Sequence, residues 1–338
     1  MSSSSSSTAE LIIVVSQQYT IYISFLILFS GVFGHISNIF VLTHLKIFHR
    51  NPSTFYLIAE SIVDLFQMMI SCTFRMAVNG FANDLTQTSL IWCKLRPLLT
   101  QSFTLISLNI ICFVAIDQCL STSYYPFLRQ KSTIKLAKSL TTIATIIWFL
   151  HGVPFVFFFE IQSKYGCNIY NQNFRNYVTY FYYLILTGVL PIIISTLFSV
   201  LAYRNVRRIV RRQIPIRRRK FDQQLTAMIL VRVGFLVTTT SPYVLQRIYT
   251  YITFMFEDSL IRKSIEQFIE TVAFSLFHFN YSGSFYLFLI SSTRFRRQVK
   301  HVFINKCWRI YCRRIIRCNQ VAAITQAITS EYDLQSIE

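Results

Sequence analysis

The sequence predicts an all-α membrane protein, a bundle of seven membrane-spanning helices followed by an amphipathic eighth helix. The composition of the 338-residue chain leads to this prediction, because 53% of its residues are hydrophobic and only 14% are charged. Soluble domains carry about 25% charged residues, so a soluble chain of this composition would struggle to cover its surface. A further observation is that the formal charge of +19 comes largely from connections between apolar runs.

Seven apolar runs are each long enough to cross a membrane, since a helix needs about 20 residues to span the hydrocarbon. The predicted spans are 19–43, 54–80, 89–122, 138–160, 177–203, 224–254 and 265–290. Phe25–Phe33 and Ile143–Leu150 contain no charged residue, whereas a helix of a soluble bundle would carry a polar face. We therefore assign residues 19–292 to the bundle.

The basic residues predict the orientation of the bundle. The connections after odd-numbered spans, together with the tail, hold 24 of the 33 Lys and Arg residues. Nine of these lie between Arg204 and Lys220, and nine lie between Arg294 and Arg317. Because cytoplasmic loops are enriched in Lys and Arg, we expect a multi-pass plasma-membrane protein with its N-terminus outside and its C-terminus in the cytosol. The positive charge then reports orientation and contact with membrane lipids, and no nucleic-acid partner is expected.

Residues 1–18 begin with a run of serines and are expected to form a short, disordered extracellular segment. They show no basic region followed by a cleavage site, so the first span is expected to act as its own insertion signal. A segment of this length is too short to be a ligand-binding domain. An external ligand would therefore meet the loops or the helix bundle itself.

Two cysteines fall on the predicted outer side, Cys93 at the end of the third span and Cys167 in the second outer loop. A disulfide between them is expected in an oxidising compartment. It would tether the loop over the mouth of the bundle and restrict the unfolded chain.

The segment after the last span predicts an amphipathic helix over 293–312, followed by a cytoplasmic tail over 313–338. Phe295, Val299 and Val302 recur at helical spacing with basic residues between them, a pattern typical of a helix lying on the inner leaflet. Three cysteines are candidates for palmitoylation, with free thiols as the alternative: Cys307, Cys312 and Cys318.

Asp64 lies near the middle of the second span, where an ionisable residue is costly and indicates a functional site. Four polar residues of other spans could converge on it, namely Asn38, Ser107, Asn280 and Ser284. Their oxygen atoms suit a small hard cation such as sodium, and no other cofactor is expected. The alternative is a structural network of hydrogen bonds between helices.

In this order and spacing, several motifs resemble the rhodopsin-like (family A) G-protein-coupled receptors over roughly residues 15–312. The matching residues are Ser37-Asn38, Ile58 to Asp64, Cys93 with Cys167, Ala115-Ile116-Asp117, Trp148, Pro191, Pro242 and Thr293 to Arg297. The resemblance implies that an extracellular ligand binds in the bundle and that a heterotrimeric G-protein binds at the cytosolic side. It also implies that Pro242 acts as a hinge in the sixth span; a purely static kink is the alternative.

The chain departs from this family at the residues of the conformational switch. Where the family has Asp-Arg-Tyr, this chain has Asp117-Gln118-Cys119, and Gln118 cannot form the family's charge pair with an acid at the position of Asp222. The family's Asn-Pro-x-x-Tyr is replaced by a run from Ser284 to Phe288. The switch residues assigned by resemblance are therefore altered in this chain.

The resemblance also assigns a ligand pocket, since family geometry would line it with eleven residues. These are Thr100, Gln101, Thr104, Tyr183, Thr187, Tyr243, Gln246, Arg247, Glu270, Phe274 and His278. For each of them, the alternative is a side chain that faces a loop or lipid. Amine receptors of the family have an acid where this chain has Thr100, which argues against an amine agonist. Arg247 and Glu270 could meet the carboxylate and the amine of a peptide, so a peptide-like ligand is favoured.

Three other functions compete with a signalling receptor. A non-signalling or constitutively active relative is favoured by the altered switch residues. A transporter or channel is disfavoured because the chain shows no repeated halves and few acids within spans. An enzyme is not expected, because the chain has no His-rich metal cluster, no nucleophile motif and no paired carboxylates in its spans.

Overall fold

The structure is a computed structural model that describes residues 2–44, 51–81, 89–162, 166–209, 216–253 and 260–307. The chain divides into two compact units, residues 1–291 and 292–338. The first unit holds all the predicted spans, and the second begins where the amphipathic helix was predicted.

The first unit is a bundle of seven helices, as the apolar runs predicted. Six helical stretches of the described chain are long and apolar enough to cross a membrane, and residues 260–291 form the seventh member. The helices are α1 (Ser2–His44), α2 (Pro52–Arg75) with π-helix η1 (Met76–Gly80), α4 (Leu90–Ser121), α6 (Ile134–Phe158), π-helix η2 (Tyr177–Val189) with α8 (Leu190–Ile209), α9 (Ile216–Thr253), and α10 (Leu260–Ser282) with α11 (Ser284–Ser291). Two short helices, α5 (Pro126–Lys131) and α7 (Gln172–Asn176), lie in the connections.

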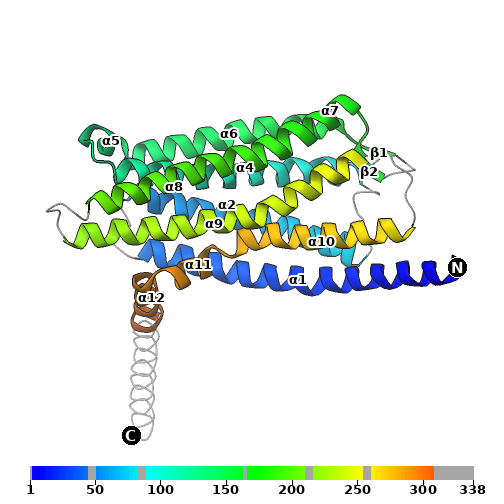
Figure 1. The fold of residues 1–338 in the computed structure, drawn as a ribbon, viewed down its shortest axis with the longest axis horizontal. Coiled ribbons are helices and arrows are strands. Elements are labelled where there is room, and N and C mark those ends of the chain that lie inside the picture. The colour runs from blue at the N-terminus through cyan, green and yellow to red at the C-terminus, as the bar shows by residue number, and fades with distance from the viewer. Residues whose placement is uncertain are drawn as a thin grey trace, which may run out of the picture. The chain divides into compact units, whose positions relative to one another are not determined.

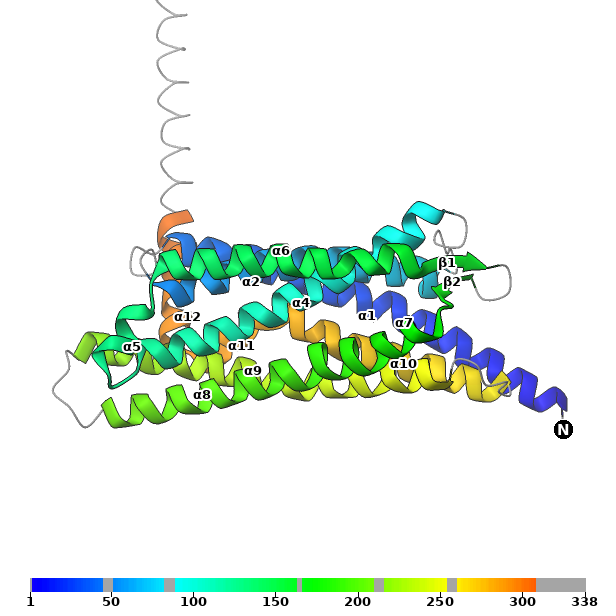
Figure 2. The same cartoon turned by 90° about the horizontal axis from the view of Figure 1, so that it is seen from above.

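Helix α4 lies inside the bundle, packed against α2, α6 and α8 (Figures 1 and 2). Helix α1 runs along α2 and α10, and α9 lies between α8 and α10. Because α4 touches so many neighbours, two thirds of its most apolar stretch is buried (67%), against 17% for α6. Polar side chains on α4 are therefore positioned to join several helices at once.

Local sequence explains where several helices begin. Asn51 precedes α2, and its side chain accepts a hydrogen bond from the Ser53 backbone N–H at 3.0 Å, while Pro52 occupies the first turn. Thr133 caps α6 in the same way through the Leu136 N–H at 3.3 Å. Such caps satisfy backbone donors that the first helical turn leaves open.

The outward face of α6 is apolar, which distinguishes the bundle from a soluble one. Ile143, Ile147 and Leu150 are each more than half exposed in the isolated chain. Large contiguous apolar surface of this kind is rare on soluble monomers. In a bilayer the same side chains contact lipid, so the exposed residues agree with a multi-pass membrane protein.

The first helix differs from the prediction of a disordered segment over residues 1–18, because α1 already begins at Ser2. Ser16 and Thr20 are buried, and Ser16 Oγ shares a hydrogen bond with Thr271 Oγ1 of α10 at 3.3 Å. This part of α1 thus packs on α10. Extending an existing helix is much easier than nucleating one, which accounts for the helix continuing back into the serine run.

Strands β1 (Phe159–Gln162) and β2 (Gly166–Ile169) form an antiparallel hairpin in the connection between α6 and α7. Gly166 has a φ of 68°, a conformation that favours glycine because a Cβ atom would be strained there. Behind the hairpin, Phe155, Ile169 and Tyr182 belong to one buried cluster. Figure 1 shows this hairpin at one end of the bundle and α5 at the other. We call the two ends the hairpin end and the Asp117 end, because Asp117 of α4 accepts a hydrogen bond from Ser132, which directly follows α5.

The second unit contains α12 (Thr293–Lys300) and π-helix η3 (His301–Cys307). Ser292 caps α12, since its side chain accepts a hydrogen bond from the Phe295 N–H at 3.0 Å. The predicted eighth helix over 293–312 is thus helical up to residue 307, where the described chain ends.

Gly152 of α6 permits close packing against α4, and a larger residue there is expected to destabilise the bundle. A Cβ atom at Gly152 would lie 2.5 Å from Ser102 Oγ and 2.7 Å from Leu98 Cδ1. We expect Gly152→Leu to lower the free energy of unfolding by about 1–3 kcal/mol through overpacking, measured as a lower melting temperature. Gly234→Leu is the matched control, because a Cβ there meets nothing within 4 Å; equal effects of both variants would contradict this assignment.

Candidate functional site

A cavity of about 190 Å³ opens among α2, α4, η2, α9 and α10 beneath the hairpin. Phe159 and Asn168 of the two strands line it at the hairpin end, and Thr104 of α4 lies deeper in the bundle. Clefts for drug-sized ligands measure about 300–1,000 Å³, so this cavity holds a small molecule or one end of a longer one.

Eight of the eleven residues that the sequence assigned to a pocket line this cavity. They are Thr100, Gln101, Thr104, Tyr183, Tyr243, Arg247, Phe274 and His278. Thr187, Gln246 and Glu270 are not among the described lining residues. Thr187 is buried on η2, Gln246 lines a separate cavity with Tyr249, and Glu270 lies behind the arginines that do line it.

Hydrogen bonds and ring stacking between helices hold the polar wall of the cavity in place. Gln67 Nε2 of α2 donates to Thr104 Oγ1 of α4 at 2.9 Å, and Gln101 Nε2 donates to the Tyr183 hydroxyl at 3.3 Å. The Tyr243 ring stacks on Phe277 with centroids 4.1 Å apart. The walls are thus preorganised by contacts that cross from one helix to the next.

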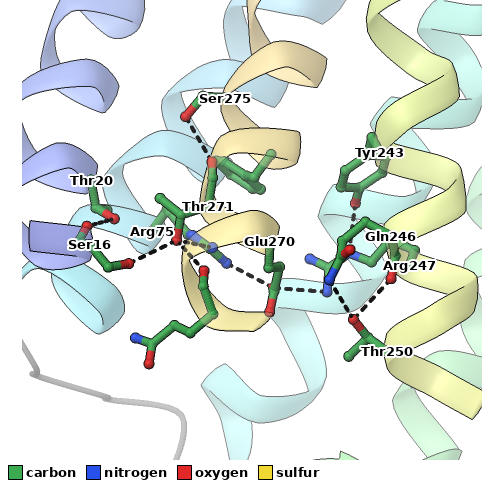
Figure 3. A network of polar contacts seen from close by, with 12 residues as sticks. Ser16, Thr20, Arg75, Tyr243, Gln246, Arg247, Thr250, Glu270, Thr271 and Ser275 are labelled. Carbon is green, nitrogen blue, oxygen red and sulfur yellow. Dashed lines mark hydrogen bonds and ion pairs between the residues drawn. The ribbon is translucent and has the colours of Figure 1, made fainter. Parts of the chain in front are cut away.

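One carboxylate joins two arginines beside the cavity (Figure 3). Glu270 Oε1 of α10 lies 3.1 Å from Arg75 Nη1 of α2 and 3.2 Å from Arg247 Nη1 of α9. Arg75 also donates to Thr271 Oγ1 at 3.1 Å, and Thr271 contacts Ser16 of α1. Four helices therefore meet in this network. The sequence led us to expect that Glu270 and Arg247 would each bind an opposite charge of a peptide, whereas in this structure they bind each other.

The Cys93–Cys167 disulfide predicted from the sequence is present, with the two Cα atoms 5.7 Å apart. It joins the start of α4 to strand β2, where Cys167 lies opposite Ile161. Both cysteines line the cavity, so the disulfide holds the hairpin over its mouth.

Sequence reasoning missed Arg75 and Arg96, which also line the cavity. The Arg75 guanidinium lies 4.7 Å from the Phe274 ring centroid, and that of Arg96 lies 3.8 Å from the Phe74 centroid. The sequence did contain a signal for both residues, namely a basic side chain inside or at the end of an apolar span. Such a side chain is costly in a membrane and indicates a function.

A second charged cluster is buried within the bundle around Asp64. Ser107 Oγ donates to Asp64 Oδ1 at 2.5 Å. Arg232 of α9 lies 2.8 Å from Glu60 Oε1 and 3.8 Å from Asp64 Oδ2, and it donates to Asn280 Oδ1. The structure thus brings together Asp64, Ser107 and Asn280, as expected, and adds an arginine–glutamate pair that sequence reasoning missed.

The Arg232 guanidinium lies beside Asp64, the carboxylate at which the sequence predicts a sodium ion. The other two predicted ligands do not reach Asp64 in the described contacts: Asn38 donates to Ser61 Oγ at 2.8 Å, and Ser284 is buried at the start of α11. Two carboxylates face one guanidinium, so one negative charge remains if both are ionised. Sodium binding stays a prediction, with Arg232 as a competitor for the same carboxylate.

At the Asp117 end, two neighbouring residues of α4 share a contact with Ser53 of α2, whose Oγ also lies 3.4 Å from Gln118 Oε1, and each makes further contacts of its own. Asp117 accepts hydrogen bonds from Ser53 Oγ at 2.5 Å and Ser132 Oγ at 2.6 Å. Gln118 Nε2 donates to Thr226 Oγ1 of α9 at 2.8 Å. The chain therefore forms a hydrogen bond between two neutral side chains of α4 and α9. The rhodopsin-like receptors that the sequence resembles form a charge pair near this position.

The remaining predicted switch residues are distributed along α9 and α11. Pro242 lies inside α9, and Phe288 is buried on α11. Asp222 lies on α9, but its side chain is outside the described set, as is that of Cys307. Cys312 and Cys318 lie outside the described residues, so palmitoylation stays a prediction.

Comparison with known families agrees with a bundle of seven membrane-spanning helices. The family model described as 7 transmembrane receptor (rhodopsin family) matches residues 37–284. Among curated proteins, none matches the chain. The matched region extends from the first helix to the start of α11 and includes every lining residue of the cavity, the disulfide and the Asp64 cluster.

Proposed function

Because the chain belongs to the rhodopsin family of seven-transmembrane receptors, we propose that it binds an extracellular, peptide-like ligand in the cavity under the hairpin and signals to a heterotrimeric G-protein. The observation that carries this proposal is the cavity itself, walled by several helices and covered by a disulfide-tethered hairpin. Its mixture of aromatic surface and a few directional polar groups is typical of ligand sites.

The small volume of the cavity supports a ligand that inserts only one end. About 190 Å³ is too little for a whole peptide of several residues. One end of the peptide would enter the cavity, and its other residues would contact the hairpin and the neighbouring loops. The receptor acts through binding and conformational change, without covalent chemistry.

The distribution of basic residues supports a plasma-membrane location with the hairpin end outside. The Asp117 end, with its Lys- and Arg-rich connections, then faces the cytosol. There it would contact anionic lipid headgroups and the G-protein.

Gln118 is the residue on which coupling depends in this proposal. A hydrogen bond between neutral groups contributes about 0.5–1.5 kcal/mol, and one to a charged group contributes about 1.5–3 kcal/mol. The Gln118–Thr226 bond would therefore hold α9 against α4 more weakly than a charge pair does, which favours ligand-independent signalling. A non-signalling relative is the second candidate, favoured by the same substitution.

We expect Thr226→Val to raise basal signalling by about fivefold, because it removes a bond of about 1 kcal/mol from the resting state. Gln118→Leu should raise it by at least as much, since it also removes the contact in which Gln118 Oε1 accepts from Ser53 Oγ at 3.4 Å. The measurement is second-messenger output in cells that express promiscuous G-proteins. Ser121→Ala is the control, since Ser121 bonds only within α4, to the Gln118 carbonyl at 3.1 Å, among the described contacts.

A Gln118→Arg variant completes this test, because it restores the residue type that the family uses. Both forms should be screened with peptide libraries after surface expression has been verified. If neither changes any second messenger, the G-protein proposal fails and the non-signalling candidate stands.

A further inference from the structure

A buried ion pair joins α9 to α2 within the bundle. Arg232 Nη2 of α9 lies 2.8 Å from Glu60 Oε1 of α2 and 3.8 Å from Asp64 Oδ2 of the same helix. Arg232 Nε also donates to Glu60 Oε1 at 2.9 Å, so two nitrogen atoms of one guanidinium contact the same carboxylate. Arg232 reaches α10 as well, where it donates to Asn280 Oδ1. One side chain of α9 is therefore bound to two neighbouring helices.

Burial makes this contact costly to break. The side chains of Arg232 and Glu60 are each 3% exposed, and that of Asp64 is 0% exposed. Water cannot replace the partner of a charge in such surroundings, so separating a buried pair costs far more than separating a surface pair. The ion pair therefore opposes any displacement of this part of α9 away from α2.

The same helix has the features of a hinge at Pro242. Proline lacks the backbone N–H that would bond to the carbonyl of Thr238 in the preceding turn. In that turn the Thr239 and Ser241 hydroxyls donate to backbone carbonyls four residues earlier, at 2.7 and 2.8 Å. Such side-chain bonds often bend helices. Helix α9 is therefore easier to bend here than along a regular stretch.

Arg232 lies on the part of α9 between this hinge and the Asp117 end. At 1.5 Å per residue, Arg232 is about 15 Å from Pro242 along the helix. A change of bend of about 20°, the size of a sharp kink, would move Arg232 by about 5 Å. A displacement of this size is larger than the 2.8 Å contact with Glu60 can accommodate. Bending of α9 away from α2 and the intact ion pair therefore exclude each other.

The other polar contact of this part of α9 is weaker. Within the described residues 223–241, the other side chain that bonds to a neighbouring helix is Thr226, which accepts from Gln118 Nε2 at 2.8 Å. That bond joins two neutral groups, and a charge-assisted bond is roughly twice as strong. Arg232 therefore provides the stronger of the two polar restraints on the part of α9 that faces the Asp117 end.

We propose that the Arg232–Glu60 ion pair is a latch that holds this part of α9 against α2 in the resting receptor and separates when the receptor becomes active. Asp64 and Asn280 position the Arg232 guanidinium. This inference rests on the proposed signalling function. It adds a charged restraint inside the bundle to the neutral restraint at Gln118.

Glu60→Gln is the first test of the latch. The substitution keeps the size of the side chain and removes its charge, while Arg232 still faces Asp64, so no buried cation is left without an acid. We expect basal second-messenger output to rise by about tenfold, because a charge-assisted contact of the resting state becomes a neutral one. The measurement uses cells that express promiscuous G-proteins, at matched surface expression.

A control and a rescue variant make this test specific. Glu266→Gln is the matched control, because Glu266 of α10 accepts from the Tyr249 hydroxyl of α9 at 2.6 Å, on the other side of the hinge; it should leave basal output unchanged. Exchanging the charges, with Glu60→Arg and Arg232→Glu together, should bring basal output back toward the wild type. Should the exchanged variant not reach the surface, Glu60→Gln still tests the latch.

A second measurement follows the position of α9 without any G-protein. Spin labels are attached to Ala227→Cys on α9 and Lys138→Cys on α6, two exposed positions, in purified full-length protein whose other accessible thiols have been replaced by serine. Helix α6 packs on α2 and α4, so it serves as the reference. We expect Glu60→Gln to increase the population of a longer label distance by about tenfold, and Glu266→Gln to leave the distances unchanged.

The possible results separate the latch from the proposed signalling function. A longer label distance in Glu60→Gln without any second-messenger response supports the latch while counting against G-protein coupling. Unchanged label distances overturn the latch, and they leave the proposed function in place if the wild type signals. A lower melting temperature of Glu60→Gln with unchanged distances shows that the ion pair is only structural, which also overturns the inference.

Discussion

An Arg232→Leu variant is expected to lose on the order of 3–5 kcal/mol of folding free energy, because it leaves buried carboxylates without their cation. Glu60 and Asp64 are 3% and 0% exposed, and Arg232 contacts both. Few positions in the described bundle combine such burial with charge. The measurement is the melting temperature of the purified protein in detergent, compared with the wild type under the same conditions.

Two further variants separate the effect of charge from that of packing at Arg232. Arg232→Lys keeps the positive charge without the planar fork and should lose less stability than Arg232→Leu. Adding Glu60→Gln to Arg232→Leu should recover part of the loss, since it removes one of the unpaired charges. A melting temperature of Arg232→Leu equal to that of the wild type would contradict the ion pair.

The same measurement tests the sodium prediction. If sodium binds at Asp64, replacing potassium with sodium should raise the melting temperature of the wild type, and Asp64→Asn should abolish this difference. Arg232→Leu should increase it, because a competing cation has been removed. A wild type that responds equally to both ions rejects the sodium site and leaves Arg232 as the cation of this cluster.

Loss of the Cys93–Cys167 disulfide is expected to have an effect of similar size, about 2–5 kcal/mol. The two residues are 74 positions apart in the chain, so the disulfide closes a long loop and also holds the hairpin over the cavity. We expect Cys93→Ser and Cys167→Ser each to reduce surface expression and melting temperature strongly.

The double variant should lower surface expression and melting temperature no further than either single variant does, because both substitutions remove the same bond. Cys119→Ser is the control, since Cys119 is a free, half-buried cysteine on the same helix as Cys93. Normal expression and stability of Cys93→Ser would show that the disulfide is dispensable.

The seven spans could be predicted because hydrophobicity along a stretch of about 20 residues is a local property of the chain. The predicted 138–160 and the observed Ile134–Phe158 differ only at their ends. The start of α1 was less predictable. Its packing against α10 through Ser16 and Thr271 is a contact between residues 255 positions apart, which no local pattern reveals.

The cavity was predictable in part. Eight of its lining residues followed from the family resemblance, because related sequences place equivalent positions on the same helix faces. Arg75 and Arg96 were missed, although both are charged residues in or beside apolar spans. That both line one cavity emerges only when α2 and α4 are placed side by side.

The sequence by itself determined the membrane class, the seven spans, the disulfide partners and the presence of a costly acid at Asp64. These follow from residue type, run length and the distribution of basic residues, all of which are written along the chain. Only the tertiary structure decided which charges meet: Glu60 with Arg232, and Glu270 with both Arg75 and Arg247. Pairing between helices depends on their order and rotation in the bundle, and a favourable ion pair in a low-dielectric interior forms only when both partners are brought within a few ångströms.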